Sequence, residues 1–335
     1  MDLNQFLAEW FDSSDKIKVH TSGSTGQPKT IWLNKEKMRI SARQTCSFLG
    51  LKPHDVALLC MPLDYIAGKM MAVRADTCQL HLISVPPTSR PLERLVGVSG
   101  KAVHIDFAAM IPMQVLLSLE DSTTREVLKS IRHLIIGGGP INALLEKELK
   151  DFPNAVWSTY GMTETMSHIA LRRLSGKDAS QWYEPFAGVT VALDQDDCLM
   201  VTAPAILDET ITTNDIAELH PDGRRFRILG RKDNVICSGG IKIQMEEVEE
   251  KLRPVVFGDF AITKCPHPVL GECVVMLTTS ADVSHIKQLC ADNLPRYWVP
   301  KEYVSVTEIP LTPSGKIARK EAFDVACSKL KGKLR

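Results

Sequence analysis

Short apolar runs that alternate with helix-length segments restrict the fold of this chain most. Continuous apolar stretches occur at 55–61, 79–85, 102–105 and 131–136, and segments long enough for a helix separate them. A continuous apolar run is typical of a strand in a parallel sheet, because helices cover both faces of such a sheet. The pattern predicts a doubly wound α/β sheet.

Two helices are expected before and between these strands. An amphipathic helix is predicted within residues 1–16, with Phe11 among its inward residues. A second helix is predicted to run to about Leu49, with Asn34 as its N-cap and Gly50 at its end.

The pattern of the sequence changes after residue 184. Short alternating strands predict a small β subdomain, and the charged turn at 230–234 marks a domain boundary. Beyond it, a hairpin through Ser238-Gly239-Gly240 and alternating helices and strands predict a small α+β domain. We therefore expect an N-terminal domain at 1–230 and a C-terminal domain at 231–335.

Overall composition limits the classes of partner. The chain has 335 residues, is 44% hydrophobic, and balances 40 basic with 40 acidic residues, so no global field recruits nucleic acid or an anionic membrane. No apolar run approaches the length of a membrane span. Nine scattered cysteines without a C-x-x-C pair indicate reduced thiols. A cytoplasmic protein is expected.

A run rich in glycines and hydroxyls lies between two β-prone stretches near the N-terminus. Glycine lets a backbone approach an anion, and N–H and hydroxyl groups can surround phosphate oxygens. By composition alone, an ordinary flexible connection is the commoner meaning of such a run. It is also not the usual G-x-x-x-x-G-K-[ST] nucleotide loop. The candidate phosphate-binding residues are Thr21, Ser22, Gly23, Ser24, Thr25, Gly26 and Lys29.

Two further groups of candidate residues follow predicted strands. Gly137, Gly138 and Gly139 end the strand at 131–136, and either bare backbone for a flat ligand or a tight turn explains them. Tyr160-Gly161-Met162-Thr163-Glu164 follows a strand at 155–159. The carboxylate there suits a magnesium ligand, whereas a capped helix start at Thr163 would leave Tyr160-Gly161 unexplained.

Arg74 lies within an otherwise apolar helical segment. It is either an anchor for a carboxylate or part of a solvated helix end, and the second is the commoner meaning of a lone arginine.

Six motifs, taken in order, resemble those of the adenylate-forming superfamily over nearly the whole chain. They are T-S-G-S-T-G-x-P-K, G-G-G-P, Y-G-M-T-E, an Asp-ending T-x-D, G-R-x-D-x-x-I-x-x-G-G-x-x-I and P-S-G-K-I-x-R. The resemblance implies a two-step reaction. A carboxylate attacks ATP to give an acyl-adenylate, and a thiol, usually that of coenzyme A, then displaces AMP.

The resemblance also implies roles for the residues of the motifs. The loop from Thr21 to Gly26 would hold the β- and γ-phosphates with Lys29 nearby, and the three glycines would line the adenine and acyl pocket. The remaining assignments concern nucleotide, metal and catalysis: Tyr160 beside the purine, Gly161 as a further cofactor-binding residue, Thr163 at the α-phosphate, Glu164 at Mg²⁺, Asp215 and Arg231 at the ribose, and Lys316 as the catalytic lysine.

Members of this superfamily rotate the C-terminal domain between the two half-reactions. By resemblance, Asp233 matches the hinge, and Ser238, Gly239 and Gly240 would line the tunnel for coenzyme A.

Within the superfamily, the chain is most similar to the o-succinylbenzoate-CoA ligase family of menaquinone biosynthesis. The similar stretches are Y-G-M-T-E-T-x-S-x-I, I-x-S-G-G and P-L-D-Y-I-A-G, the last with Tyr65 where the family has histidine. Such a substrate carries a second carboxylate, and His133, Arg74, His168 and Arg172 are candidates to bind it.

Two departures from the superfamily pattern leave questions open. The phosphate loop begins at residue 21, whereas most members carry many more residues before it, and Asn214 replaces a glycine. With a shortened large domain, the sequence does not decide which surface binds coenzyme A. It also does not decide whether the protein forms a homodimer. The alternatives are a ligase for another aryl or short acyl acid, a stand-alone enzyme that loads a carrier protein, and an ATP-binding protein without catalysis.

Overall fold

The computed structural model of the chain describes residues 1–20, 30–96, 103–139, 141, 143–312 and 316–331. It contains two compact units. The larger unit comprises Met1–Ala192, Met200–Ile211 and Leu219–Arg227, and the smaller unit comprises Leu193–Leu199, Thr212–Glu218 and Ile228–Arg335.

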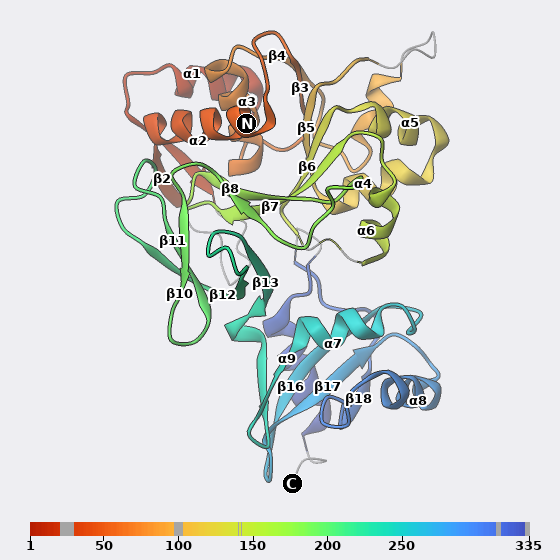
Figure 1. Cartoon of the computed structure of the whole chain (residues 1–335). Coiled ribbons are helices and arrows are strands. Elements are labelled where there is room, and N and C mark those ends of the chain that lie inside the picture. The colour runs from red at the N-terminus through yellow and green to blue at the C-terminus, as the bar shows by residue number, and fades with distance from the viewer. Residues whose placement is uncertain (21–29, 97–102, 140, 142, 313–315, 332–335) are drawn as a thin grey trace. The chain divides into compact units, whose positions relative to one another are not determined.

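A seven-stranded sheet forms the centre of the larger unit (Figure 1). Its strand order is β4-β3-β5-β6-β7-β8-β9, in which β4 to β7 are parallel neighbours and β8 and β9 are antiparallel. The strands are β3 (Val56–Leu59), β4 (His81–Ser84), β5 (Phe107–Met110), β6 (His133–Ile136), β7 (Ala155–Met162), β8 (Ser167–Arg173) and β9 (Glu184–Pro185). The predicted doubly wound sheet is confirmed.

One strand of this sheet lies later in the sequence than predicted. The strand expected at 102–105 is instead β5, whose residues are all buried. The carboxylate of Asp106 accepts the backbone N–H of Val56 at 2.8 Å, which fixes the start of β5 beside β3. The antiparallel strand β8 was not predicted.

Helices lie on both sides of this sheet (Figure 1). The helix α3 packs against β3, β4 and β8. The other helices of the unit are α1 (Leu3–Trp10), α2 (Lys35–Leu49), the 3₁₀ turn at Pro91–Leu95, α4 (Pro112–Glu120), α5 (Ser122–Ser130) and α6 (Ala143–Lys150), and α3 itself spans Ile66–Thr77.

The first two helices can be compared with the predictions made for their ends. In α2, the Asn34 side chain accepts the Lys37 N–H at 3.1 Å, and Gly50 has φ 64°, so the predicted caps are confirmed. The first helix ends at Trp10, and Phe11 is 63% exposed. The prediction that Phe11 points inward is wrong, because the chain leaves the helix there.

A four-stranded sheet follows, as the alternating pattern predicted. Its order is β10-β11-β12-β13. The strands are β10 (Thr190–Leu193), β11 (Cys198–Thr202), β12 (Ile211–Leu219) and β13 (Phe226–Arg231), followed by a 3₁₀ turn at Lys232–Asn234.

The smaller unit contains a five-stranded sheet with the path β15-β14-β17-β16 and with β18 beside β17. Two buried clusters show that both faces of the sheet are covered. Residues of α7, α8 and Ile262 form one cluster, while residues of α9 and Ala261 form the other, as the alternation of side chains along β16 requires. The elements are β14 (Val235–Ser238), β15 (Ile241–Gln244), α7 (Met245–Leu252), β16 (Phe260–His267), β17 (Gly271–Thr278), α8 (Val283–Asn293), β18 (Glu302–Ser305) and α9 (Arg319–Leu330).

An ion pair with a buried carboxylate joins these layers. Arg319, the first residue of α9, donates to both carboxylate oxygens of Glu249 on α7, at 2.6 and 2.9 Å. The same two residues bond to the backbone of Ile262, Glu249 accepting its N–H at 2.8 Å and Arg319 donating to its carbonyl at 2.9 Å.

Glu249→Ala should therefore destabilise the smaller unit by about 3 kcal/mol, because it removes the acceptor of two charge-assisted hydrogen bonds from Arg319 and leaves the buried Ile262 N–H without its acceptor. Denaturant unfolding measures this change. Glu250→Ala is the matched control, because Glu250 is the exposed neighbour on the same helix. Equal unfolding free energies for the two variants would contradict a structural role for the pair.

Candidate active site

The predicted phosphate loop lies outside the described residues, but its flanks are described. The strands β1 (Lys16–His20) and β2 (Thr30–Asn34) form an antiparallel hairpin whose last pair is His20 with Thr30. His20 also forms a parallel bridge to Tyr65 in the P-L-D-Y segment. The hairpin therefore brings both ends of the loop together beside the residues that precede α3.

The predicted glycines lie at the carboxyl end of β6, as expected. A Cβ at Gly137 would lie 2.3 Å from Thr159 Oγ1, and Gly138 has φ 80°. Thr159 belongs to the neighbouring strand β7, so the glycine backbone contacts the strand that carries Tyr160. The structure brings these two predicted groups together at one edge of the sheet.

The strand β7 extends past Tyr160 to Met162 and pairs there with β8. A bulge between Tyr160 and Gly161 interrupts the register. The Tyr160 ring lies against the rings of Tyr183 and Phe226, with centroids 5.9 and 5.1 Å away. Thr163 and Glu164 occupy the turn that follows, where Glu164 is exposed. The capped helix start at Thr163 is absent from this described turn.

Gly161→Ala should disrupt the bulge, because an added Cβ would lie 2.1 Å from the Ser167 carbonyl oxygen and 2.4 Å from His168 Cα. We expect a loss of about 3 kcal/mol in unfolding free energy and weaker ATP binding. Gly223→Ala serves as the control, since it has φ 69° but nothing within 4 Å, and should cost only about 1 kcal/mol. Denaturant unfolding and nucleotide titration measure both effects, and equal losses would contradict the steric argument.

Arg74 on α3 is 1% exposed, so its interpretation as a solvated helix end is wrong. Its Nη2 donates to Ser167 Oγ at 3.1 Å and lies 3.5 Å from His168 Nδ1, and its Nε is buried without a hydrogen-bond partner among the residues that the structure describes. Burial lowers the pKa of Arg74 to about 10, so the group stays charged at neutral pH. No carboxylate among the described residues forms an ion pair with it.

The other predicted site residues lie in the smaller unit. Arg231 Nη1 lies 3.7 Å from Asp215 Oδ1, and Arg231 Nη2 donates to Asp233 Oδ2 at 3.1 Å. Asn214 donates to the same oxygen of Asp233 at 3.3 Å. The predicted ribose ligands and the predicted hinge residue therefore form one cluster.

Lys316 lies near this cluster. Burial, and next the positive charge of Arg231, lower the pKa of Lys316, while Asp215 acts in the opposite direction. The Lys316 N–H donates to Thr312 Oγ1 at 3.1 Å, and its carbonyl accepts the Thr312 N–H at 2.6 Å. These bonds hold the backbone of Lys316 beside Thr312.

Ser238, Gly239 and Gly240 form the predicted hairpin. Ser238 pairs with Ile241, which leaves Gly239 and Gly240 as a two-residue turn with φ values of 58° and 84°. A turn with positive φ at both positions requires glycine or asparagine. The hairpin is confirmed, whereas its role toward coenzyme A stays a prediction.

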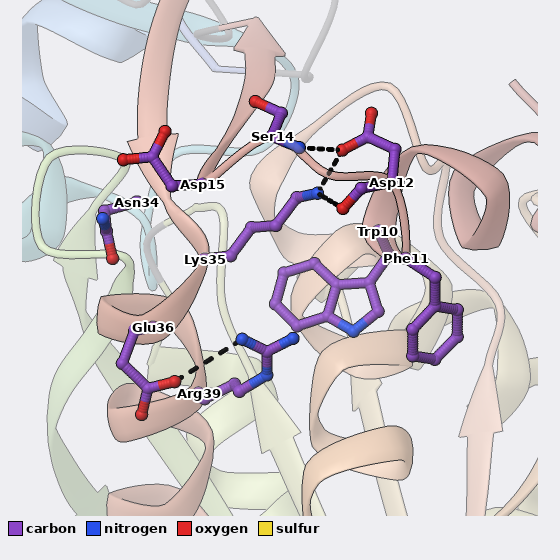
Figure 2. Close-up of a pocket in the computed structure, with 9 residues that line it drawn as sticks. All are labelled: Trp10, Phe11, Asp12, Ser14, Asp15, Asn34, Lys35, Glu36 and Arg39. Carbon is purple, nitrogen blue, oxygen red and sulfur yellow. Dashed lines mark hydrogen bonds and ion pairs between the residues drawn. The ribbon is translucent and has the colours of Figure 1, made fainter.

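A pocket of about 280 Å³ lies elsewhere in the larger unit (Figure 2). In it, Lys35 pairs with Asp12 at 2.7 Å and Arg39 lies over the Trp10 ring at 4.7 Å. The pocket includes Asn34, which pairs with Lys16 at the opposite end of the hairpin from His20. It is about 14 Å along the strands from His20 and Thr30, and none of the predicted site residues lines it.

The described residues include no group of three His, Cys, Asp or Glu side chains arranged to hold a metal ion. Mg²⁺ is usually held by one or two carboxylates together with substrate phosphates, so the single carboxylate of Glu164 fits such a site. None of the described helices is long and apolar enough to cross a membrane.

Comparison with protein families identifies the class that these features define. The family model "AMP-binding enzyme" matches residues 17–204, and "AMP-binding enzyme C-terminal domain" matches residues 257–316. The chain belongs to the AMP-binding enzyme family, as the motifs indicated. Its adenylate-forming fold combines a large N-terminal α/β domain with a smaller C-terminal domain.

Individual relatives narrow the comparison. The 2-succinylbenzoate–CoA ligases of Listeria innocua and Bacillus mycoides are each 26% identical to it, over 92% and 94% of this chain and 70% and 71% of theirs. A solved acyl-CoA synthetase (AMP-forming)/AMP-acid ligase II-like protein from Dyadobacter fermentans is 32% identical, with a TM-score of 0.64, over 96% of this chain and 92% of that one.

One solved structure is of a similarly named enzyme. The o-succinylbenzoate coenzyme A synthetase of Bacillus subtilis, in complex with ATP and magnesium ion, has a TM-score of 0.74 and 20% identity, over 91% of this chain and 69% of that one. This likeness shows the shared fold.

Sequence reasoning missed the surroundings of Arg74. Thr45 on α2 and Ser167 on β8 both belong to the hydrogen-bonded group around it. The serine of Y-G-M-T-E-T-M-S was visible as part of a motif, but no local signal places Thr45 there.

Proposed function

We propose that this protein activates o-succinylbenzoate with ATP and transfers the acyl group to coenzyme A. The family membership, the names of the curated relatives and the order of the motifs support the reaction type. The substrate proposal depends on one observation, the buried guanidinium of Arg74, which has no carboxylate partner among the described residues. An unpaired buried charge is costly, and a ligand carboxylate would compensate it.

Arg74 is the best of the four candidates for the second carboxylate. Arg172 already forms a bidentate pair with Glu146, at 2.7 and 3.2 Å. His133 lies at the start of β6, the end of the strand opposite the glycines, and burial together with Arg132 lowers its pKa to about 4. Burial holds the pKa of His168 well below its ordinary value, so this imidazole is neutral.

The surroundings of Arg74 support its placement near the reacting groups. Its partner Ser167 pairs with Met162, and His168 pairs with Gly161, across the β7–β8 ladder. Arg74 is therefore one hydrogen bond from the strand pair that carries Tyr160 and Gly161. A guanidinium there would bind the carboxylate that must stay unreacted.

The remaining roles in the larger unit are proposed from the motifs. Thr21 to Gly26, with Lys29, would bind the phosphates, and Tyr160 would contact the purine beside the glycines at 137–139. Thr163 would contact the α-phosphate and Glu164 would bind Mg²⁺, which supplies positive charge against the phosphates.

The smaller unit would supply the ribose ligands and the catalytic cation. Asp215 and Arg231 would bind the ribose, and Lys316 would neutralise charge as the substrate carboxylate approaches the α-phosphate. With a domain boundary after residue 230 and Asp233 as the hinge, the C-terminal domain would rotate between the half-reactions. This rotation would bring Ser238, Gly239 and Gly240 to coenzyme A.

Mass spectrometry of the thioester product tests the proposal. The protein is incubated with ATP, Mg²⁺, coenzyme A and one acid at a time: o-succinylbenzoate, 3-benzoylpropionate (which lacks the ring carboxylate), benzoate, acetate or a medium-chain fatty acid. We expect a clear preference for o-succinylbenzoate. Preference for another acid would contradict the proposed substrate and still agree with the proposed reaction type. Nucleotide binding without turnover of any acid would contradict both proposals.

A further inference from the structure

A chain of hydrogen bonds lies behind Arg74 in the larger unit. His168 is 5% exposed and Thr45 is fully buried. Thr45 Oγ1 lies 3.0 Å from His168 Nε2, and Ser167 Oγ lies 3.2 Å from His168 Nδ1. Ser167 Oγ in turn accepts from Arg74 Nη2 at 3.1 Å. The chain connects helix α2 to the guanidinium on helix α3 through the first two residues of β8.

The direction of each bond follows from the ends of the chain. Thr45 Oγ1 donates its proton to the Ser41 carbonyl at 3.1 Å, so it accepts from His168 Nε2. His168 therefore carries its proton on Nε2 and has a lone pair on Nδ1. Ser167, which accepts from Arg74, donates to that lone pair. Every hydroxyl and ring nitrogen in the chain then has one consistent role.

The backbone that places Ser167 is strained. Met166 has φ 59° and Ser167 has φ 142°, values that side chains other than glycine rarely adopt. Such conformations persist where the surrounding structure fixes them and they cluster at functional sites. Here the strained turn directs the Ser167 hydroxyl between Arg74 and His168.

We propose that Thr45, Ser167 and His168 are positioning residues that aim the guanidinium of Arg74 at the second carboxylate of the substrate. The proposal rests on the proposed function. The hydrogen-bonded chain holds Nη2. Among the described residues, Nε has no hydrogen-bond partner and Nη1 has only a 3.9 Å contact with Met71 Sδ, so the Nε and Nη1 side is left for an anion. A neutral His168 accepts without adding a second positive charge, so it fixes the direction of Arg74 without competing for the anion.

Thr45→Val tests this chain of hydrogen bonds, because it keeps the shape of the side chain and removes the hydroxyl that accepts from His168. We expect about a tenfold rise in KM for o-succinylbenzoate, with kcat and the KM for ATP unchanged, because a misaimed group weakens positioning of one substrate. Thr45→Ser should restore the KM, and the KM for 3-benzoylpropionate should not change. Equal effects on both acids, or no effect on either, would overturn the proposal.

A second measurement does not depend on the substrate. Long-range ¹H–¹⁵N spectra of the protein labelled with [¹⁵N]histidine report which ring nitrogen carries the proton. We expect His168, assigned by its absence in His168→Asn, to be protonated on Nε2 alone, and Thr45→Val to perturb its Nε2 shift. Protonation on Nδ1, or on both nitrogens, would overturn the proposal even if o-succinylbenzoate is the substrate. The expected tautomer together with no turnover of this acid would contradict the proposed function instead.

Discussion

Lys316→Ala should slow acyl-adenylate formation about a thousandfold and leave thioester formation from a supplied acyl-adenylate nearly unchanged. In the first half-reaction an anion approaches a polyanion, and removing one preorganised positive donor from such a site typically costs a factor of 10²–10³ or more. Lys316 is half-buried in the smaller unit near Asp215 and Arg231, and this burial lowers its pKa. Partial exclusion of water also strengthens the electrostatic interaction of its ammonium group with anions.

Two separate assays measure this effect. Pyrophosphate release reports the first half-reaction, and coenzyme A consumption with a synthetic acyl-adenylate reports the second. Lys320→Ala is the matched control, because Lys320 is exposed on α9 four residues away. A similar loss in both half-reactions would contradict the role of Lys316, and a similar loss in both variants would point to a general disturbance of the smaller unit.

The parallel strands could be predicted from the sequence because each is a continuous apolar run. Helix α2 could be predicted because Asn34 and Gly50 are local signals at its two ends. The hairpin at Gly239 and Gly240 could be predicted because a two-residue turn with positive φ depends on the residues in the turn itself. Each of these features is determined within a few residues of the chain.

The antiparallel strand β8 and the burial of Arg74 could not be predicted in this way. The turn into β8 uses positive φ at Met166 and Ser167, where glycine would be the ordinary signal. The environment of Arg74 depends on Thr45, Ser167 and His168, which approach only after α2, α3 and β8 pack together. A lone arginine in an apolar helix has the same local pattern whether it is solvated or buried.

Arg74→Met should make the protein more stable and a much poorer enzyme for a dicarboxylic substrate. The guanidinium is buried, charged and without a carboxylate partner among the described residues, so only its hydrogen bonds to Ser167 and His168 offset its desolvation in the free protein. Methionine fills a similar volume with apolar atoms, and Ser167 and His168 can still bond to each other. We expect a gain of about 1–2 kcal/mol in unfolding free energy.

The same substitution should raise the KM for o-succinylbenzoate about a hundredfold, since it leaves a desolvated ligand carboxylate without its partner. The KM for 3-benzoylpropionate should stay within about twofold. Arg43→Met is the control, because the Arg43 side chain is 55% exposed and pairs with Glu36 on the surface. Substituting a residue that serves ligand binding is expected to raise the unfolding free energy and to lower the affinity for the ligand. A residue kept for structure would lose stability on substitution and affect both acids alike, so that result would remove Arg74 from the site.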